Sequence, residues 1–263
     1  MKLLELNNVS IRFGHKFVVK DVSWEIQEGE NWAFLGLNGC GKTTLLSLLA
    51  GYMGPTSGTI KICGTEVTNN NHQLLRQTIG FVSSSFFNKV FTNEQVLDIV
   101  LSGKTESLYP NLAEVSMKDV QQARSLLDIY QLGDSLRYSY DMLSKGQQQC
   151  VLLARAQMKE NRLLILDEPC EGLDILRKDL FLQQIKKYAE SGVGIIYVTH
   201  HTEELSNIFH KACFMRDGTL HSTGSFNAMF TEQNLEDFFQ RKVNKTVQEN
   251  RIFLNFGWTK KLH

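Results

Sequence analysis

The apolar positions of this chain follow different periods in different regions. Residues 3–13 alternate between apolar and polar side chains, which predicts a strand with one solvated face. Residues 163–166 and 195–198 are continuous apolar runs, which are typical of strands buried on both faces. Between these regions, residues 94–101, 117–129 and 146–159 carry apolar side chains at helical spacing, with a loop around Pro110. The pattern predicts a strand-rich core with an inserted helical lobe.

After the helical block, strands and helices alternate. Helical patterns at 175–190, 202–209 and 235–241 alternate with short strands, and the last two predicted strands are 213–215 and 219–222. Such alternation indicates a parallel sheet with right-handed crossovers. We therefore predict an α/β fold with a mixed, largely parallel sheet and an antiparallel β edge. The domain spans 1–240, with its core at about 1–83 and 156–224, its helical lobe at about 84–155 and a tail at 241–263.

Composition narrows the class of protein. The 28 basic and 28 acidic residues cancel, which argues against nonspecific nucleic-acid binding as the main activity. The five cysteines include no C-x-x-C pair, so we expect reduced thiols in a cytoplasmic protein. No window of about 18 apolar residues predicts a membrane span. The tail is basic and aromatic, and contains Phe253, Phe256 and Trp258; it either packs on the domain or contacts a partner.

The residues between the strand at 32–35 and the helix at 45–50 carry the strongest chemical signal. Gly36 to Thr43 match the pattern G-x-x-x-x-G-K-[ST]. Glycines let the backbone wrap closely around an anion, and the free N–H groups of a helix start favour negative charge. Lys42 adds a cation for the outer phosphates, and the Thr43 hydroxyl suits Mg²⁺. We assign nucleoside triphosphate binding to Gly36, Asn38, Gly39, Cys40, Gly41, Lys42, Thr43 and Thr44.

Two acids follow the apolar strand at 163–166. The carboxyl end of a strand is where an open α/β sheet places its ligand chemistry. Asp167 is suited to the Mg²⁺ shell, and Glu168 to orienting or deprotonating an attacking water.

Two further places suit a phosphate. Ser144 is a good N-cap for the helix that follows, and no acidic residue at this helix start repels an anion. His200 and His201 follow the strand at 195–198, and one histidine at a sheet edge is able to hydrogen-bond a γ-phosphate. Taken alone, the start of the Ser144 helix is more typical of an ordinary capped helix. The two histidines, taken alone, are equally compatible with an ordinary loop.

Together these elements resemble the ATP-binding cassette (ABC) ATPase family over about residues 3–240. The matching motifs are Walker A at 36–43, an LSGGQ-like LSKGQ at 143–147, Walker B with its glutamate at 163–168, a D-loop-like segment at 171–174 and the switch histidine His200. The resemblance implies a P-loop NTPase cassette that hydrolyses Mg-ATP as a head-to-tail dimer. It implies that the adenine stacks on Phe13, and that Glu168, His200 and Lys42 are the catalytic residues. It also implies that Ser144, Gly146 and Gln147 of the second copy close over the ATP.

Two positions depart from the family pattern. Ser83-Ser84-Ser85 stands where the family carries a Q-loop glutamine that contacts the metal, and Ser84 is the matching position. We therefore assign the metal to Thr43, Asp167 and Ser84. Lys145 replaces the first glycine of LSGGQ. The serine-containing segment is similar to that of molybdate-transport and photorepair ATPases, several of which lack an obvious permease.

We predict the ATPase subunit of an ABC transporter, which binds a membrane permease at the inner face of the membrane. Exposed aromatics at Phe86, Phe87 and Phe91 would mark the docking site of the permease, whereas buried ones would only pack the helical lobe. The alternative is a soluble ABC-type ATPase that acts on nucleic acid or the ribosome. Ser84 and the basic tail favour this second hypothesis.

Overall fold

The core of the protein is a largely parallel sheet. The computed structural model describes residues 1–105, 108, 115–205, 207–249 and 251–256. In this part of the chain a six-stranded sheet has the order β10-β9-β3-β8-β7-β6. Only the pair β9–β10 is antiparallel. The strands are β3 (Asn31–Gly36), β6 (Ile79–Ser83), β7 (Leu163–Asp167), β8 (Gly194–Val198), β9 (Lys211–Arg216) and β10 (Thr219–Ser225).

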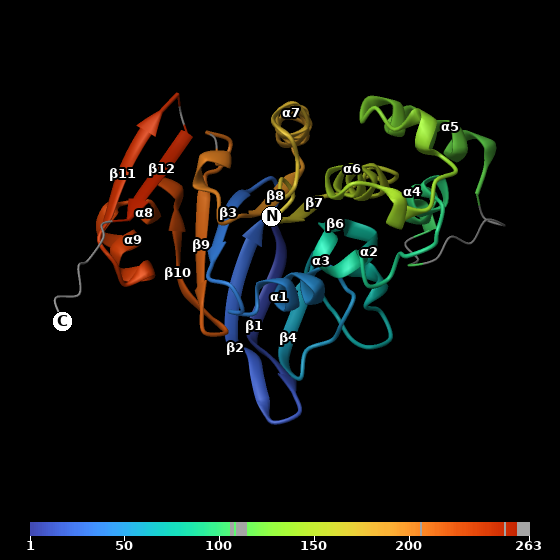
Figure 1. Ribbon diagram of the computed structural model, residues 1–263. Helices are drawn as coiled ribbons and strands as arrows, with labels where there is room; N and C mark the ends of the chain where they lie inside the picture. The colour runs from blue at the N-terminus through green and yellow to red at the C-terminus, as the bar shows by residue number, and fades with distance from the viewer. Residues whose placement is uncertain (106–107, 109–114, 206, 250, 257–263) are drawn as a thin grey trace.

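A second, antiparallel sheet packs beside the core (Figure 1). Its order is β2-β1-β4-β5, with β1 (Lys2–Phe13), β2 (Lys16–Gln27), β4 (Ser57–Ile62) and β5 (Thr65–Glu66). Trp24 of β2 meets Trp32 of β3 edge to face, with ring centroids 5.2 Å apart, and Phe34 lies 5.7 Å from Trp24. These rings join the two sheets. The predicted fold class, with its mixed sheet and antiparallel edge, is confirmed.

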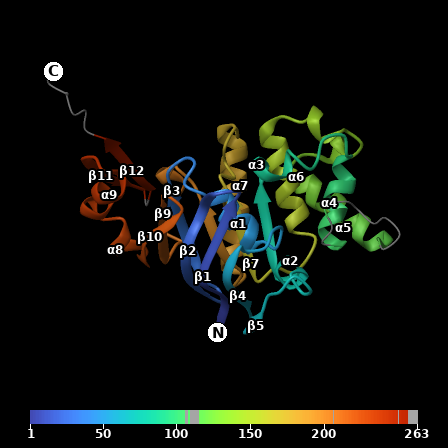
Figure 2. The ribbon, with the colours of Figure 1, turned by 90° about the horizontal axis from the view of Figure 1, so that it is seen from below.

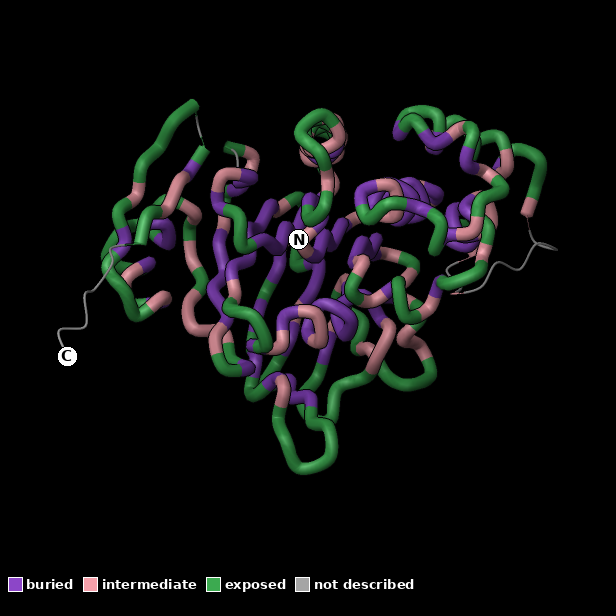
Figure 3. Tube along the Cα trace, in the orientation of Figure 1, coloured by how far each residue is buried: buried purple, intermediate pink, exposed green. Residues whose placement is uncertain are grey.

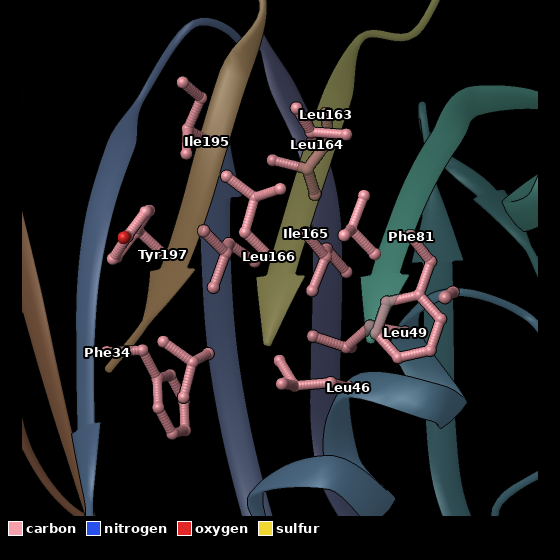
Figure 4. Packing of buried hydrophobic residues seen from close by; sticks show 14 of the residues in the cluster. Phe34, Leu46, Leu49, Phe81, Leu163, Leu164, Ile165, Leu166, Ile195 and Tyr197 are labelled. Atoms are coloured by element: carbon pink, nitrogen blue, oxygen red, sulfur yellow. The ribbon is translucent and has the colours of Figure 1, made fainter. Parts of the chain in front are cut away.

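Helix α1 (Lys42–Leu49) covers the ends of the central strands. Its apolar side chains Leu46 and Leu49 face β7 and β6, where they meet Ile165 and Phe81 (Figure 4). Strands β7 and β8 are buried along their whole length, as their continuous apolar runs predict. Buried residues accordingly follow the sheet, α1 and two helices of the lobe (Figure 3).

The helical lobe lies at one end of the molecule and the C-terminal elements at the other (Figures 1 and 2). The lobe consists of α3 (Ser84–Phe87), α4 (Val96–Thr105), α5 (Met117–Ile129), α6 (Lys145–Ala156) and the 3-10 turns η2 (Gly133–Ser135) and η3 (Tyr140–Met142). The other helices are α2 (Gln73–Thr78), α7 (Ile175–Glu190), α8 (Phe226–Met229) and α9 (Glu232–Phe239). None of the helices in the described ranges is long and apolar enough to cross a bilayer.

One sequence-based expectation needs correction, and the tail contains a hairpin that the sequence analysis did not predict. In place of a helix at 202–209, the described residues there form only the 3-10 turn η4 (Thr202–Glu204). The turn is fixed by Glu204, which is buried and accepts hydrogen bonds from Thr199 (2.8 Å) and Tyr197 (3.0 Å). The tail contains a hairpin of β11 (Val243–Gln248) and β12 (Arg251–Phe256) that contacts η4. The predicted loop at Pro110, and Trp258, Lys260 and Lys261 of the tail, lie outside the described residues.

The aromatic residues after β6 pack inside the molecule. Phe87 and Phe91 are 0% and 1% exposed, and their rings stack with centroids 5.3 Å apart. Phe86 is partly buried and lies 4.9 Å from Tyr52. The reading of Phe87 and Phe91 as an exposed docking surface is therefore wrong. They join the helical lobe to the core instead.

Candidate active site at the carboxyl ends of β3 and β7

The glycine loop is shaped by contacts that exclude larger side chains. β3 delivers Gly36 to the loop, and α1 begins at Lys42 after Gly41, whose φ is 100°. A Cβ on Gly41 would lie 2.4 Å from the carbonyl oxygen of Val18, and a Cβ on Gly36 would lie 2.7 Å from the Lys42 side chain. A side chain at Gly41 would overlap the backbone of β2, and one at Gly36 would displace the side chains of Lys42 and Cys40.

The Lys42 ammonium is held across the loop. Its Nζ donates to the carbonyl oxygens of Gly36 (2.8 Å) and Leu37 (3.2 Å), and the side chain is only 8% exposed. The same Nζ lies 3.9 Å from Oε1 of Glu168. A fixed cation therefore stands beside the N–H groups of the first turn of α1, which have no intrahelical partner. This arrangement suits the outer phosphates of a nucleotide.

The loop and the Walker B strand line one cavity of about 370 Å³. This volume lies in the range of small-ligand sites. Most of the predicted loop and acid positions line it, namely Asn38, Gly39, Gly41, Lys42, Thr43, Thr44, Ser84, Asp167 and Glu168. Ser85, of the predicted serine run, and Glu171, of the D-loop-like segment, also line it, as does Val18, which the sequence did not single out. Gly36 and Cys40 support the loop from behind: Cys40 is buried, and burial raises the pKa of its thiol.

Three hydroxyl groups converge on one oxygen of Asp167. Thr43 and Ser83 donate to Oδ2 at 2.9 Å each, and Ser85 donates to it at 3.3 Å. Burial raises the pKa of Asp167, and the hydrogen bonds from Ser83 and Thr43 oppose that shift. Hydroxyl and carboxylate oxygens are ligands that Mg²⁺ accepts, and this ion usually takes its other ligands from phosphates and water. The donor set therefore fits Mg²⁺.

In the described part of the chain, the protein side chains alone do not supply a complete set of metal ligands. Among the residues that the structure describes, no three or more His, Cys, Asp or Glu side chains gather closely enough to hold an ion. One carboxylate with hydroxyl groups is the arrangement expected for an ion that arrives with its nucleotide.

Glu168 is presented by a strained backbone. Its φ is 48°, in the left-handed region, and its N–H donates to the carbonyl of Val198 at 2.9 Å. The side chain is one-quarter exposed, and its Oε2 lies 3.4 Å from Nδ1 of His200. The amide of Gln149, on α6, donates to the Glu168 carbonyl at 3.2 Å. Glu168 thus stands between Lys42 and His200 at the mouth of the cavity, where a water is able to reach it.

The other predicted contacts lie outside this cavity. Phe13 is 56% exposed near the turn between β1 and β2. Ser144 and Gln147 form a capping box at the start of α6, in which the Gln147 N–H donates to Ser144 Oγ at 3.3 Å. Gly146 packs against the D-loop-like segment, because a Cβ there would lie 2.9 Å from Leu173. Within one chain, the structure does not bring these residues to Lys42.

Ser84 is placed differently from its prediction. Its hydroxyl accepts a hydrogen bond from Gln149 at 3.3 Å, whereas Ser83 and Ser85 reach Asp167. The run of three serines indicated the region, but nothing in the sequence distinguished its members. Gln149 was also overlooked, because it stands in a run of glutamines at 147–149.

Comparison with known proteins places these features in a family. A profile of the family described as "ABC transporter" matches residues 19–171. An uncharacterized ABC transporter ATP-binding protein, YlmA of Bacillus subtilis, is 37% identical over 96% of each chain. A putative ABC transporter ATP-binding protein of Streptococcus mutans is 33% identical over 97% of this chain and 98% of its own.

Solved structures give the same picture of the fold. A putative metal-chelate type ABC transporter, solved in an inward-facing conformation, has a chain that is 28% identical, with a TM-score of 0.73 and full coverage of both chains. A dimeric bacterial ABC transporter cassette has a TM-score of 0.73 over 85% of this chain and 98% of its own. Its 24% identity makes that likeness one of fold alone.

Proposed function

Because this chain belongs to the family of ABC transporter ATP-binding proteins, we propose that two copies of it join head to tail and close over two molecules of Mg-ATP. The family assigns it the binding of ATP and its hydrolysis to ADP and phosphate, as a subunit of an ABC transporter. The convergence of Lys42, Asp167 and Glu168 on one cavity carries the proposal.

In the proposed mechanism, each residue has one task. Lys42 and the N–H groups of the first turn of α1 bind the outer phosphates. Thr43 and Asp167 hold Mg²⁺, which when bound supplies positive charge to the phosphate oxygens. Glu168 orients the attacking water and accepts its proton, and its backbone conformation aims the carboxylate toward the cavity. His200, next to Glu168, hydrogen-bonds the γ-phosphate.

The second copy supplies the other face of the ATP site. Ser144, Gly146 and Gln147 begin α6, whose first turn has no acidic residue, so this helix start accepts a phosphate. They do not line the cavity of their own chain, which supports a role across an interface. The exposed ring of Phe13 is free to stack on the adenine.

We extend the proposal to the partner and the subgroup. Residues 1–240 form the cassette, which binds a membrane permease at the cytoplasmic face, and the 241–263 tail is an addition to it. Ser83-Ser84-Ser85 supports membership of the subgroup with molybdate-transport and photorepair ATPases. Affinity purification from membranes tests both statements: a polytopic partner is expected, and its transported substrate identifies the subgroup. Recovery of soluble proteins alone would contradict the permease.

Trapping the closed dimer tests the mechanism. Glu168→Gln removes the carboxylate that accepts the proton and keeps a side chain of the same shape. We expect this variant with Mg-ATP to elute as a dimer in size-exclusion chromatography, and to elute as a monomer without nucleotide. Lys42→Ala is the control, since it should abolish ATP binding in calorimetry and leave a monomer under both conditions. A Glu168→Gln variant that binds ATP but stays monomeric refutes the dimer.

A further inference from the structure

The three serines at the end of β6 and the start of α3 send their hydroxyl groups in two directions. Ser83 and Ser85 lie 3.0 Å apart, and both donate to Oδ2 of Asp167. The Ser84 hydroxyl instead accepts from Nε2 of Gln149. The segment thus touches the metal-side carboxylate and helix α6 at the same time.

The sheet register and the start of α3 explain this division. β6 and β7 are parallel with Ser83 paired to Asp167, so these two side chains stand at the same level of the sheet. Successive strand side chains point to opposite faces, and Ser84 therefore turns away from Asp167. Ser83 then caps α3 by accepting from the Phe86 N–H at 3.3 Å, and the tight first turn returns Ser85 to the carboxylate.

We propose that Ser85 is the residue by which the helical lobe binds the metal of the nucleotide, and that Ser84 acts through Gln149 to position Glu168. The assignment of Ser85 to the metal rests on the proposed function. Ser83 is fully buried and already serves as a cap, whereas Ser85 is exposed and lines the cavity. Its hydroxyl shares Asp167 Oδ2 with Thr43, so the two hydroxyls approach the same oxygen from different elements.

The contacts of Gln149 support the second claim, that Ser84 positions Glu168. Its side chain is 1% exposed, and its Nε2 donates both to Ser84 Oγ and to the carbonyl of Glu168. Its Oε1 has no hydrogen-bond partner among the described residues, so the two bonds from Nε2 fix the orientation of the amide. Gln149 thereby ties the left-handed backbone of Glu168 to α6, the helix that begins at Ser144.

The metal half is tested by nucleotide binding without turnover. The affinity for a non-hydrolysable ATP analogue is measured by calorimetry with Mg²⁺ and again with EDTA. The ratio of the two affinities isolates the contribution of the metal. For Ser85→Ala we expect the ratio to fall about tenfold, as befits one contact to a charged group, while the affinity in EDTA stays unchanged.

Two serine variants serve as controls in the same experiment. Ser84→Ala and Ser125→Ala, the latter an exposed serine on α5, should keep the ratio of the unmodified chain. A Ser85→Ala variant that keeps the ratio, or a Ser84→Ala variant that loses it, overturns the assignment. An unmodified chain that fails to bind the analogue at all contradicts the proposed function instead.

The positioning half is tested by steady-state kinetics. Gln149→Met keeps the length of the side chain and removes its donor, and Gln148→Met is the matched control, since the Gln148 amide bonds the Tyr140 carbonyl outside the cavity. We expect Gln149→Met to lower kcat about tenfold at unchanged KM and unchanged analogue affinity, because only the positioning of the Glu168 carboxylate is lost. Ser84→Ala should also lower kcat. In the double variant with Gln149→Met, the fold-loss in kcat should be smaller than the product of the two single fold-losses.

The kinetic split decides the second half. An unchanged kcat in Gln149→Met, or equal losses in kcat and analogue affinity, overturns the positioning role. A fully additive Ser84→Ala and Gln149→Met pair shows that the two residues act separately, which also overturns it.

Discussion

A methyl group on Gly41 is the sharpest test of how the nucleotide loop is built. Gly41→Ala would place a Cβ 2.4 Å from the Val18 carbonyl oxygen and 3.2 Å from Met215, at a φ of 100°. Gly39→Ala is a matched control in the same loop. Gly39 also has a positive φ, of 77°, but a Cβ there would have no neighbour within 4 Å.

The two substitutions share one cost and differ in another. A non-glycine residue in the left-handed region loses about 1–2 kcal/mol. Both variants also reduce the entropy of the unfolded chain by a similar amount, so that contribution cancels in their difference. The overlap with backbone at Gly41 adds about 1–3 kcal/mol, as for overpacked sites. We expect Gly41→Ala to lower the free energy of unfolding by about 1–3 kcal/mol more than Gly39→Ala does.

Urea unfolding without nucleotide measures this difference. Far-UV circular dichroism gives the midpoint and slope for each variant, and the slope should not change. Nucleotide is left out because both variants alter its binding site, and bound ligand would stabilise each to a different extent. Equal losses of stability in the two variants would refute the argument, since they would show that β2 does not press against the loop at Gly41.

Three further outcomes follow from the packing and the thiols. Phe87→Ala should cost about 3–5 kcal/mol in urea unfolding, because the ring is fully buried and lies 4.8 Å from the Arg155 guanidinium; a loss under 1 kcal/mol would contradict this. Gly103→Ala should lower the Tm, because a Cβ would lie 2.0 Å from the Arg155 carbonyl oxygen; an unchanged Tm would show that α4 and α6 separate freely. Burial raises the pKa of Cys150 to about 11, so with a disulfide reagent at pH 8 the partly exposed Cys63 should react first and Cys150 only after unfolding; rapid labelling of Cys150 in the folded chain would refute its burial.

The sequence predicts most of the core because its signals there are local. The continuous apolar runs of β7 and β8 and the helical spacing over α5 and α7 need no knowledge of distant residues. The predicted helix at 202–209 failed for the opposite reason: buried Glu204, bonded to Tyr197 and Thr199, looks like a solvated residue in the sequence. The β11–β12 hairpin was missed because its strands are short, basic and only weakly alternating.

The site divides in the same way. The glycine loop and the two acids follow directly from a contiguous motif, and the structure brings them to one cavity. The exchange of Ser84 for Ser85 at Asp167 depends on the register between β6 and β7, which are distant in sequence. The contact from Gln149 depends on how α6 is rotated against the sheet, and no local pattern records that rotation.

The tryptophan pair between the two sheets gives the protein a built-in optical reporter. Trp24 and Trp32 are 4% and 5% exposed, their rings meet at 86°, and neither lines the nucleotide cavity. Opening of the contact between β2 and β3 would expose both buried indoles to water and so change their fluorescence. Their fluorescence therefore reports the separation of the two sheets, whereas no tryptophan in the described part of the chain lines the cavity to report nucleotide binding.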